Sequence, residues 1–130
     1  MPKEQLISVV EDDRFFRESM ERLMRSLGYA VEGFSSAHDF LSSPRFVETA
    51  CLITDVHMPA MTGIELYTHL VERKHAISTI LITGCPNDVE GARALKDGVV
   101  CYLRKPVDEK DLMQCLHAAL QTGDAPDQNP

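Results

Sequence analysis

Residues 51–63 read CLITDVHMPAMTG, an apolar run that ends in one carboxylate, Asp55, and then turns through a proline to a glycine. The apolar and β-branched residues before the acid predict a strand. Open sheets of parallel strands carry their sites at the carboxyl edge, so such a strand would bring Asp55 to that edge. Asp55 is therefore the candidate reactive group. Alone, an aspartate after a strand is more often a turn or cap residue, so its role depends on its neighbours in space.

The composition is that of an ordinary globular domain of 130 residues with a net charge of −7. This length is enough for one domain with a buried core. The acidic balance argues against a nucleic-acid-binding module, which is normally basic. No apolar run is long enough to span a membrane, and we expect no leader before Leu6. Without zinc-type spacing, the cysteines are expected to be reduced, mostly buried thiols of a cytoplasmic protein: Cys51, Cys85, Cys101 and Cys115.

Five short apolar runs alternate with five segments of helical spacing. The predicted strands span residues 6–10, 30–34, the run that ends at 55, 79–83 and 99–103. The predicted helices span residues 14–27, a short segment capped by Ser36, 64–74, 88–97, and a segment from the cap Asp108 to 121. Residues 1–121 are expected to form the domain. The polar tail, 122–130, is expected to be disordered or a linker stub.

Helical spacing also predicts which side chains face the core. The apolar positions are Phe16, Met20, Leu23, Met24 and Leu27 in the first helix, Leu66, Leu70 and Val71 in the third, Ala92, Ala94 and Leu95 in the fourth, and Leu112, Met113, Leu116, Ala119 and Leu120 in the last. Asp13 is expected to cap the first helix. Phe15 lies about 100° around that helix from Phe16, in a polar row, so we expect it to be exposed.

Nearly continuous apolar strands predict a doubly wound α/β fold, a five-stranded parallel sheet covered by helices on both faces. In the strand order 2-1-3-4-5, the first and third strands are neighbours at the topological switch point. The carboxyl ends of all strands then meet at one edge. Five side chains far apart in sequence are expected there: Glu11, Asp12, Asp55, Thr83 and Lys105.

This set of side chains suits phosphoryl transfer. Three carboxylates in close contact repel one another, and a hard divalent cation such as Mg²⁺ (or Mn²⁺) relieves that repulsion. Lys105 and the hydroxyl of Thr83 can bind an incoming anion. A carboxylate nucleophile, a metal, a lysine and a hydroxyl together fit a reaction in which catalysis is mainly positioning and charge neutralisation.

Four motifs in this order resemble the receiver domain of bacterial two-component response regulators, most closely receivers of the FixJ type. They are VVEDD at 9–13, ITDVHMPAMTGIEL at 53–66, ITG at 82–84 and YLRKP at 102–106. The resemblance covers roughly residues 6–120 and implies a flavodoxin-like (βα)5 fold in a signalling domain rather than a dedicated enzyme. It implies that a sensor histidine kinase, or a phosphotransfer protein, donates a phosphoryl group that switches the conformation.

The resemblance assigns a role to each matching residue. Asp55 is the phosphoacceptor, Asp12 a direct metal ligand, Glu11 a ligand through water, the backbone carbonyl of His57 a further ligand, Lys105 the phosphoryl-binding lysine, Pro106 the proline after a cis peptide bond, and Thr83 and Tyr102 the switch pair. His57 and Cys85 match positions that tune the lifetime of the phosphate. The domain would slowly hydrolyse its own acyl phosphate.

Three departures from the family pattern stand out. Glu11 replaces the commoner aspartate, which should preserve metal binding through a longer arm. Pro86 follows the switch threonine in a loop that is often glycine-rich, and is expected to restrict the switch. Cys101 stands where related domains often have aspartate, which puts in doubt a salt-bridged dimer through that face.

The partner surface is expected around Phe15, which we interpret as a docking anchor for the kinase; single exposed apolar residues without a role are also common. The family leaves open a homodimer formed on phosphorylation. Contact with nucleic acid is expected only through an output domain, which these residues do not contain.

Two other functions remain open. A metal-dependent aspartyl phosphatase also uses an aspartate at a strand end, but its common motif has a second aspartate where this chain has His57. A degenerate receiver that only binds partners would not need Asp12, Asp55, Thr83 and Lys105 together.

Overall fold

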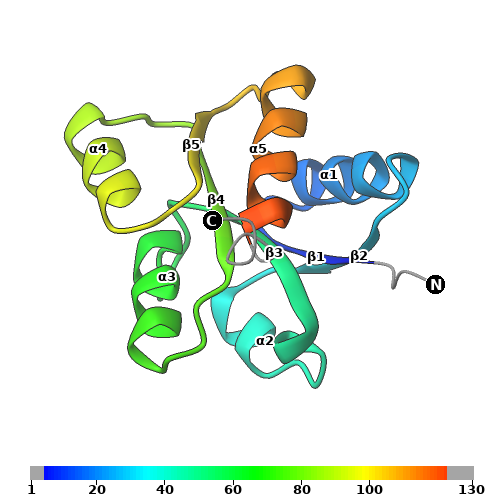
Figure 1. Cartoon of the computed structure of the whole chain (residues 1–130), viewed down its shortest axis with the longest axis horizontal. Helices are drawn as coiled ribbons and strands as arrows, with labels where there is room; N and C mark the ends of the chain where they lie inside the picture. Colours follow the sequence, from blue (N-terminus) through cyan, green and yellow to red (C-terminus); the bar gives the residue numbers. More distant parts are fainter. Residues whose placement is uncertain (1–4, 123–130) are drawn as a thin grey trace, which may run out of the picture.

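A five-stranded parallel sheet forms the centre of the computed structural model, which describes residues 5–122 (Figure 1). Its strands are β1 Leu6–Val10, β2 Ala30–Phe34, β3 Thr49–Asp55, β4 Ser78–Thr83 and β5 Cys101–Arg104, in the order β2-β1-β3-β4-β5. The helices are α1 Arg14–Ser26, α2 Ala37–Leu41, α3 Gly63–Glu72, α4 Asp88–Lys96 and α5 Glu109–Thr122, with a 3-10 turn at Phe46–Glu48. The predicted fold and strand order are confirmed. The predicted tail, apart from Thr122, lies outside the described residues.

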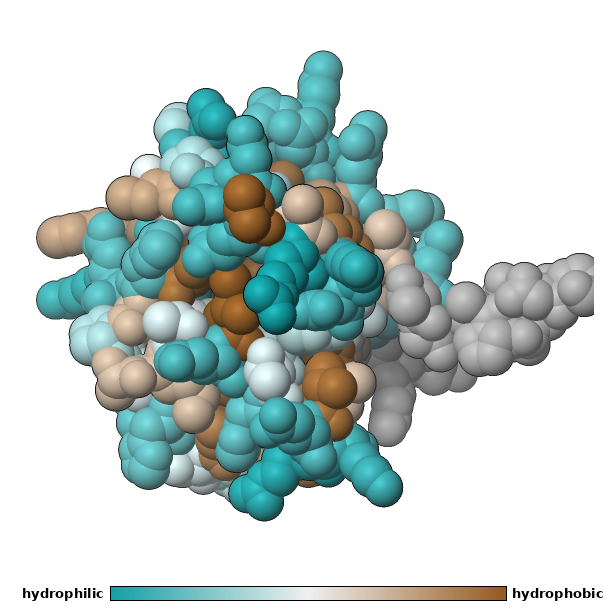
Figure 2. Space-filling model, turned by 90° about the vertical axis from the view of Figure 1, so that its left-hand side faces the viewer, coloured by the Kyte–Doolittle hydropathy of each residue, from teal (hydrophilic) through white to brown (hydrophobic). Residues whose placement is uncertain are grey.

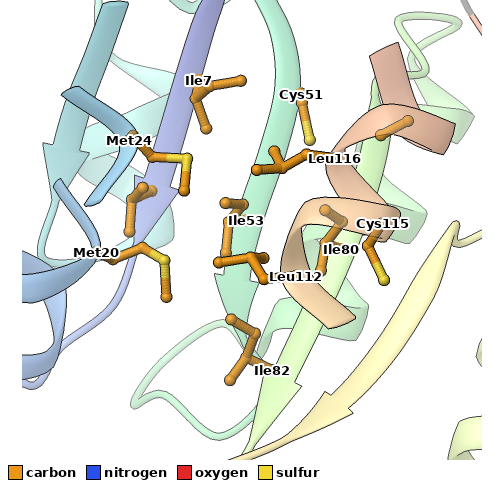
Figure 3. Packing of buried hydrophobic residues seen from close by; sticks show 12 residues of the cluster. Ile7, Met20, Met24, Cys51, Ile53, Ile80, Ile82, Leu112, Cys115 and Leu116 are labelled. Carbon is orange, nitrogen blue, oxygen red and sulfur yellow. The ribbon is translucent and has the colours of Figure 1, made fainter. Parts of the chain in front are cut away.

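Two helical layers cover the sheet, with α1 and α5 on one face and α2, α3 and α4 on the other (Figure 1). The alternation of side chains along β3 produces this division. Cys51 and Ile53 point toward α1 and α5, where they pack in one cluster with Met24 and Leu116 (Figure 3). Leu52, between them in sequence, packs with the opposite layer. Because both faces of β3 are buried, this strand is apolar almost throughout until it reaches Asp55.

Side-chain caps fix where the helices begin. The carboxylate of Asp13 accepts hydrogen bonds from the backbone N–H groups of Phe15 and Phe16, as expected for a helix cap. Thr62 and Glu65 form a reciprocal capping box at the start of α3. The N–H of Gly63, the first residue of α3, donates to the carbonyl of Val56, so the start of α3 lies close to the carboxyl end of β3, the edge that carries the candidate site.

Four of the predicted core positions are wrong. Val71, Ala92, Leu95 and Met113 are exposed. Tyr67 and Cys115 are buried instead, because the buried rows run through Leu66, Tyr67 and Leu70 in α3 and through Leu112, Cys115 and Leu116 in α5. In α4 the buried residues are Gly91 and Ala94, since the ring of Tyr102 occupies the space that a side chain at position 91 would need.

The expectation of four reduced cysteines is also wrong. Cys101 of β5 and Cys115 of α5 form a disulfide, with their Cα atoms 6.1 Å apart. The sequence holds no signal for this pair, because the two residues come together only when α5 packs back onto β5. Cys51 is a buried free thiol, as expected, and its burial raises its pKa to about 12. Cys85 is free and exposed.

The outer face formed by α3 and α4 is mainly hydrophilic, with separate hydrophobic spots between polar side chains (Figure 2). Exposed Val89 and Leu95 of α4 contribute apolar surface. Among the described residues, no helix combines the length and the apolar character that crossing a membrane requires.

Candidate functional site

Four strands deliver the candidate residues to one edge of the sheet. Glu11 follows β1, Asp55 ends β3, Thr83 ends β4 and Lys105 follows β5. Because the strands are parallel and β1 pairs with β3, the acids after β1 lie beside Asp55. One carboxylate oxygen each of Glu11, Asp12 and Asp55 lies within 4.8 Å of the others. The structure therefore brings together the acidic residues that the sequence placed at this edge.

Asp55 is almost buried, with 6% of its surface exposed. Burial raises the pKa of its carboxyl group, while Lys105 and the backbone N–H of His57 act in the opposite direction. The backbone just after it is held between β4 and α3. The N–H of Val56 donates to the carbonyl of Ile82 in β4, and the N–H of Gly63 in α3 donates to the carbonyl of Val56. The carboxylate of Asp55 thus stands on a fixed backbone, with its charge only partly compensated.

Glu11 is the most buried acid of the site, with 2% of its surface exposed. Its carboxylate accepts hydrogen bonds from the Lys105 ammonium at 2.9 Å and from the backbone N–H of Asp13 at 3.0 Å. Burial outweighs both contacts and raises the pKa of Glu11 from 4.5 to about 7. Its carbonyl also accepts a hydrogen bond from the Arg17 guanidinium at 2.8 Å, a contact that sequence reasoning did not foresee.

The donor set fits a divalent cation. Three carboxylates face a single ammonium, which leaves the ionised cluster about two charges short of neutral, and hard oxygen ligands favour Mg²⁺ or Mn²⁺. Asp12 is exposed and so has room for solvent ligands beside it. The side chain of His57 is exposed as well; the expected role of its carbonyl oxygen stays a prediction.

Lys105 is the cation of the site. Its Nζ lies 2.9 Å from Glu11 and 3.9 Å from Asp55, and 4.3 Å from the ring centroid of Phe16. The peptide bond between Lys105 and Pro106 is cis, as the resemblance implied. The contact with Phe16 was missed, because helical spacing assigned that ring to the core alone.

Thr83 and Tyr102 lie on neighbouring strands but have different partners. Thr83 is fully buried, and its hydroxyl accepts a hydrogen bond from the backbone N–H of Cys85 at 3.0 Å. Tyr102 is half-buried; its hydroxyl donates to Glu90 at 2.9 Å and accepts from the backbone N–H of Asn87 at 3.1 Å. Tyr102 therefore connects β5 to the start of α4, and its hydroxyl has its partners there and not in the acidic cluster at the site.

Phe15, the expected partner anchor, has 78% of its surface exposed. It lies in the first turn of α1, directly after the acidic residues. Its exposure is confirmed, while its role in docking stays a prediction.

Comparison with known proteins agrees with this geometry. Residues 7–117 match the family of response regulator receiver domains. The chain is 35% identical over 119 residues to the response regulator protein TmoT of Ectopseudomonas mendocina, covering 92% of this chain and 54% of TmoT. It is 33% identical over 120 residues to the transcriptional regulatory protein FixJ of Azorhizobium caulinodans, covering 92% of this chain and 57% of FixJ. The chain thus spans about half the length of these relatives.

Solved structures show the same fold. The response regulator StyR superposes with a TM-score of 0.86 at 35% sequence identity, covering 97% of this chain and 64% of StyR. The structure of FixJ-N superposes with a TM-score of 0.81 at 27% identity, covering 92% of this chain and 96% of that one.

Proposed function

The chain belongs to the family of response regulator receiver domains, whose known role is phosphorylation on an aspartate by a histidine kinase, and from this premise we propose that Asp55 is the residue that accepts the phosphoryl group. The observation that carries the proposal is the placement of Asp55: a nearly buried carboxylate, clustered with Glu11 and Asp12, and 3.9 Å from the ammonium of Lys105. Asp12 and Asp13 follow β1 on the same edge, but both are exposed.

In the proposed transfer, a carboxylate oxygen of Asp55 attacks the phosphorus of a phosphohistidine. The phosphorus–nitrogen bond breaks, and the imidazole leaves with the electron pair and takes up a proton from solvent. Lys105 compensates the charge on the phosphoryl oxygens, and Thr83 donates its hydroxyl proton to one of them; in the resting structure that hydroxyl acts as an acceptor, so its proton remains available. The acyl phosphate would later be hydrolysed slowly at the same site.

Glu11, Asp12 and Asp55 would hold Mg²⁺ or Mn²⁺, with Glu11 acting through water and the carbonyl of His57 as a further ligand. The bound ion supplies charge neutralisation between the carboxylates and the phosphoryl oxygens. The raised pKa values of Glu11 and Asp55 support this assignment, because ionising both acids in a buried site is unfavourable until a cation arrives.

The switch would run from Thr83 toward α4. If Thr83 turns to the phosphoryl group, its bond to the N–H of Cys85 weakens, and the loop that leads to Asn87 is free to move. Tyr102 holds the start of α4 through Asn87 and Glu90, so this contact would respond. His57 and Cys85, both exposed at the site's rim, are the positions expected to tune the lifetime of the phosphate.

We further propose that a sensor kinase or phosphotransfer protein docks beside Phe15 in the cytoplasm. Relatives named as transcriptional regulators extend to about twice the matched length, so any DNA contact would belong to an output domain outside this receiver. Any self-association on phosphorylation would form without a salt bridge at position 101, because Cys101 is in a disulfide with Cys115 and carries no charge.

The test is Mg²⁺-dependent labelling with acetyl phosphate, followed by intact mass. The parent protein should gain one phosphoryl group, and Asp55→Asn should gain none. Asp88→Asn is the matched control, since Asp88 is an exposed aspartate in the first turn of α4 and should label as the parent does. Turnover of a generic phosphatase substrate without a stable adduct would favour a phosphatase, and absence of any adduct in the parent would favour a binding module.

A further inference from the structure

The ammonium of Lys105 lies over the ring of Phe16, with Nζ 4.3 Å from the ring centroid. At this distance the negative face of an aromatic ring attracts a cation. Among the described residues, two cations lie beside the acidic cluster. Lys105 contacts the carboxylates themselves, whereas Arg17 donates to the backbone carbonyl of Glu11. A neutral ring therefore completes the surroundings of the lysine that is expected to bind the phosphoryl oxygens together with Thr83.

The start of α1 explains why this ring reaches Lys105. Asp13 caps the helix through the N–H groups of Phe15 and Phe16, and its own N–H donates to the carboxylate of Glu11, which ties the first turn to the carboxyl edge of the sheet. The side chain of Phe16 is half-buried and points inward, whereas Phe15, about 100° further around the helix, points to solvent. Two adjacent phenylalanines thus have opposite surroundings.

Lys105 needs such support because its side chain also borders a groove into which it could turn away from the acids. Its side chain lines a groove of about 570 Å³ between α1 and the start of α5, together with Phe16, Pro106 and Val107. A lysine side chain is long and flexible, and 23% of this one is exposed. Phe16 both lines that groove and lies under the ammonium that contacts Glu11.

The lysine must also change partners during the reaction. At rest it is hydrogen-bonded to Glu11 at 2.9 Å and is 3.9 Å from Asp55, so binding a phosphoryl group on Asp55 requires it to shift. A further carboxylate would compete with the phosphoryl oxygens for its N–H donors. An aromatic face attracts the cation without accepting a directed hydrogen bond, so it can hold the ammonium near the acids while its donors change partners.

We propose that Phe16 is a positioning residue that holds Lys105 over the phosphoryl site by a cation–π contact. The inference rests on the proposed function of Asp55 and Lys105. It adds that the electron density of this ring, and not only its volume, sets how well the site binds a phosphoryl group.

The test replaces Phe16 by 4-fluoro-, 3,5-difluoro- and 3,4,5-trifluorophenylalanine, which weaken the negative face of the ring with little change in size. The readout is the apparent Kd of beryllium trifluoride, a phosphoryl mimic, at saturating Mg²⁺, followed by NMR. We expect Kd to rise with each fluorine, reaching about five-fold for the trifluoro ring, as a cation–π contact at a partly exposed site would give. Phe16→Leu, which keeps an apolar side chain, should lose at least as much, while Mg²⁺ affinity changes less than two-fold.

The same fluorinated residues at Phe15 are the matched control. That ring is 78% exposed and faces solvent, so its fluorination should leave Kd unchanged. A flat series at position 16, or an equal response at position 15, would overturn the role of Phe16 while leaving the role of Asp55 intact. If the parent does not bind the mimic, or if Asp55→Asn binds the mimic as tightly as the parent does, the proposed function fails and the inference fails with it.

Discussion

Gly63 is the position where a single added methyl group should disturb the site most directly. It is the first residue of α3. A Cβ atom at this position would lie well within 3.0 Å of the backbone carbonyl oxygen of Asp55, a distance that real Cβ contacts essentially never show. The carbonyl carbon of Asp55 would lie at 3.0 Å and the Cγ2 of Thr54 at 3.2 Å. Because the main obstacle is backbone and not a flexible side chain, Gly63→Ala must push α3 and the end of β3 apart.

The expected loss of stability is the balance of two effects. Forcing an extra carbon into a packed contact costs about 1–3 kcal/mol, while alanine gains up to about 1 kcal/mol over glycine in a helix. We therefore expect Gly63→Ala to lower the free energy of unfolding by about 1–2 kcal/mol, measured by urea denaturation. Since the carboxylate of Asp55 shifts with its backbone, labelling by acetyl phosphate should slow by up to about 100-fold.

Gly84→Ala is the matched control at the same edge of the sheet. A Cβ there would have only the Cδ of Lys105 within 4 Å, at 3.9 Å, which is an ordinary contact. Its stability should stay within about 0.5 kcal/mol of the parent. If Gly63→Ala proves as stable and as rapidly labelled as Gly84→Ala, the close approach of α3 to Asp55 does not hold the site as argued.

Three further perturbations test separate features. The variant Cys101→Ser, which lacks the disulfide, should be less stable than the oxidised parent by about 3 kcal/mol, the chain-entropy value for a loop of this size. Equal urea midpoints for the variant and the parent would contradict this expectation. Because folding raises the pKa of Glu11 from 4.5 to about 7, the folded state binds more protons in that window, so the metal-free protein should lose stability as pH rises through it. Glu11→Gln should flatten this decline, and an unchanged pH slope would argue against it. Phe15→Ala should leave labelling by acetyl phosphate intact but slow transfer from the cognate kinase about ten-fold or more, as loss of an aromatic anchor would; equal slowing with both donors would refute docking.

The elements and the acidic edge could be predicted because each depends on local signals. The strand β1 and its neighbour β2 match their predicted ranges, and the caps Asp13 and Ser36 mark helix starts by side-chain chemistry that needs no tertiary context. Once the strands are known to be parallel, Asp55 and Glu11 must share an edge.

The remaining features depend on how helices pack across the sheet. Spacing alone could not predict that Cys115 of α5 is buried while Met113 is exposed. The rotation of the helix against β4 and β5 decides which side of it is covered. The same packing joins Cys101 to Cys115 and brings Phe16 over Lys105, two contacts between residues far apart in sequence. No periodicity reports such pairs.

The central claim is that Asp55 becomes the acyl phosphate. Borohydride reduces an acyl phosphate of aspartate to homoserine, which marks the residue permanently. After incubation with Mg²⁺ and acetyl phosphate, reduction and peptide mass analysis should find homoserine at position 55 and at no other aspartate. Homoserine at Asp12 or Asp13 instead, or none anywhere in a protein that carries phosphate, would contradict the account.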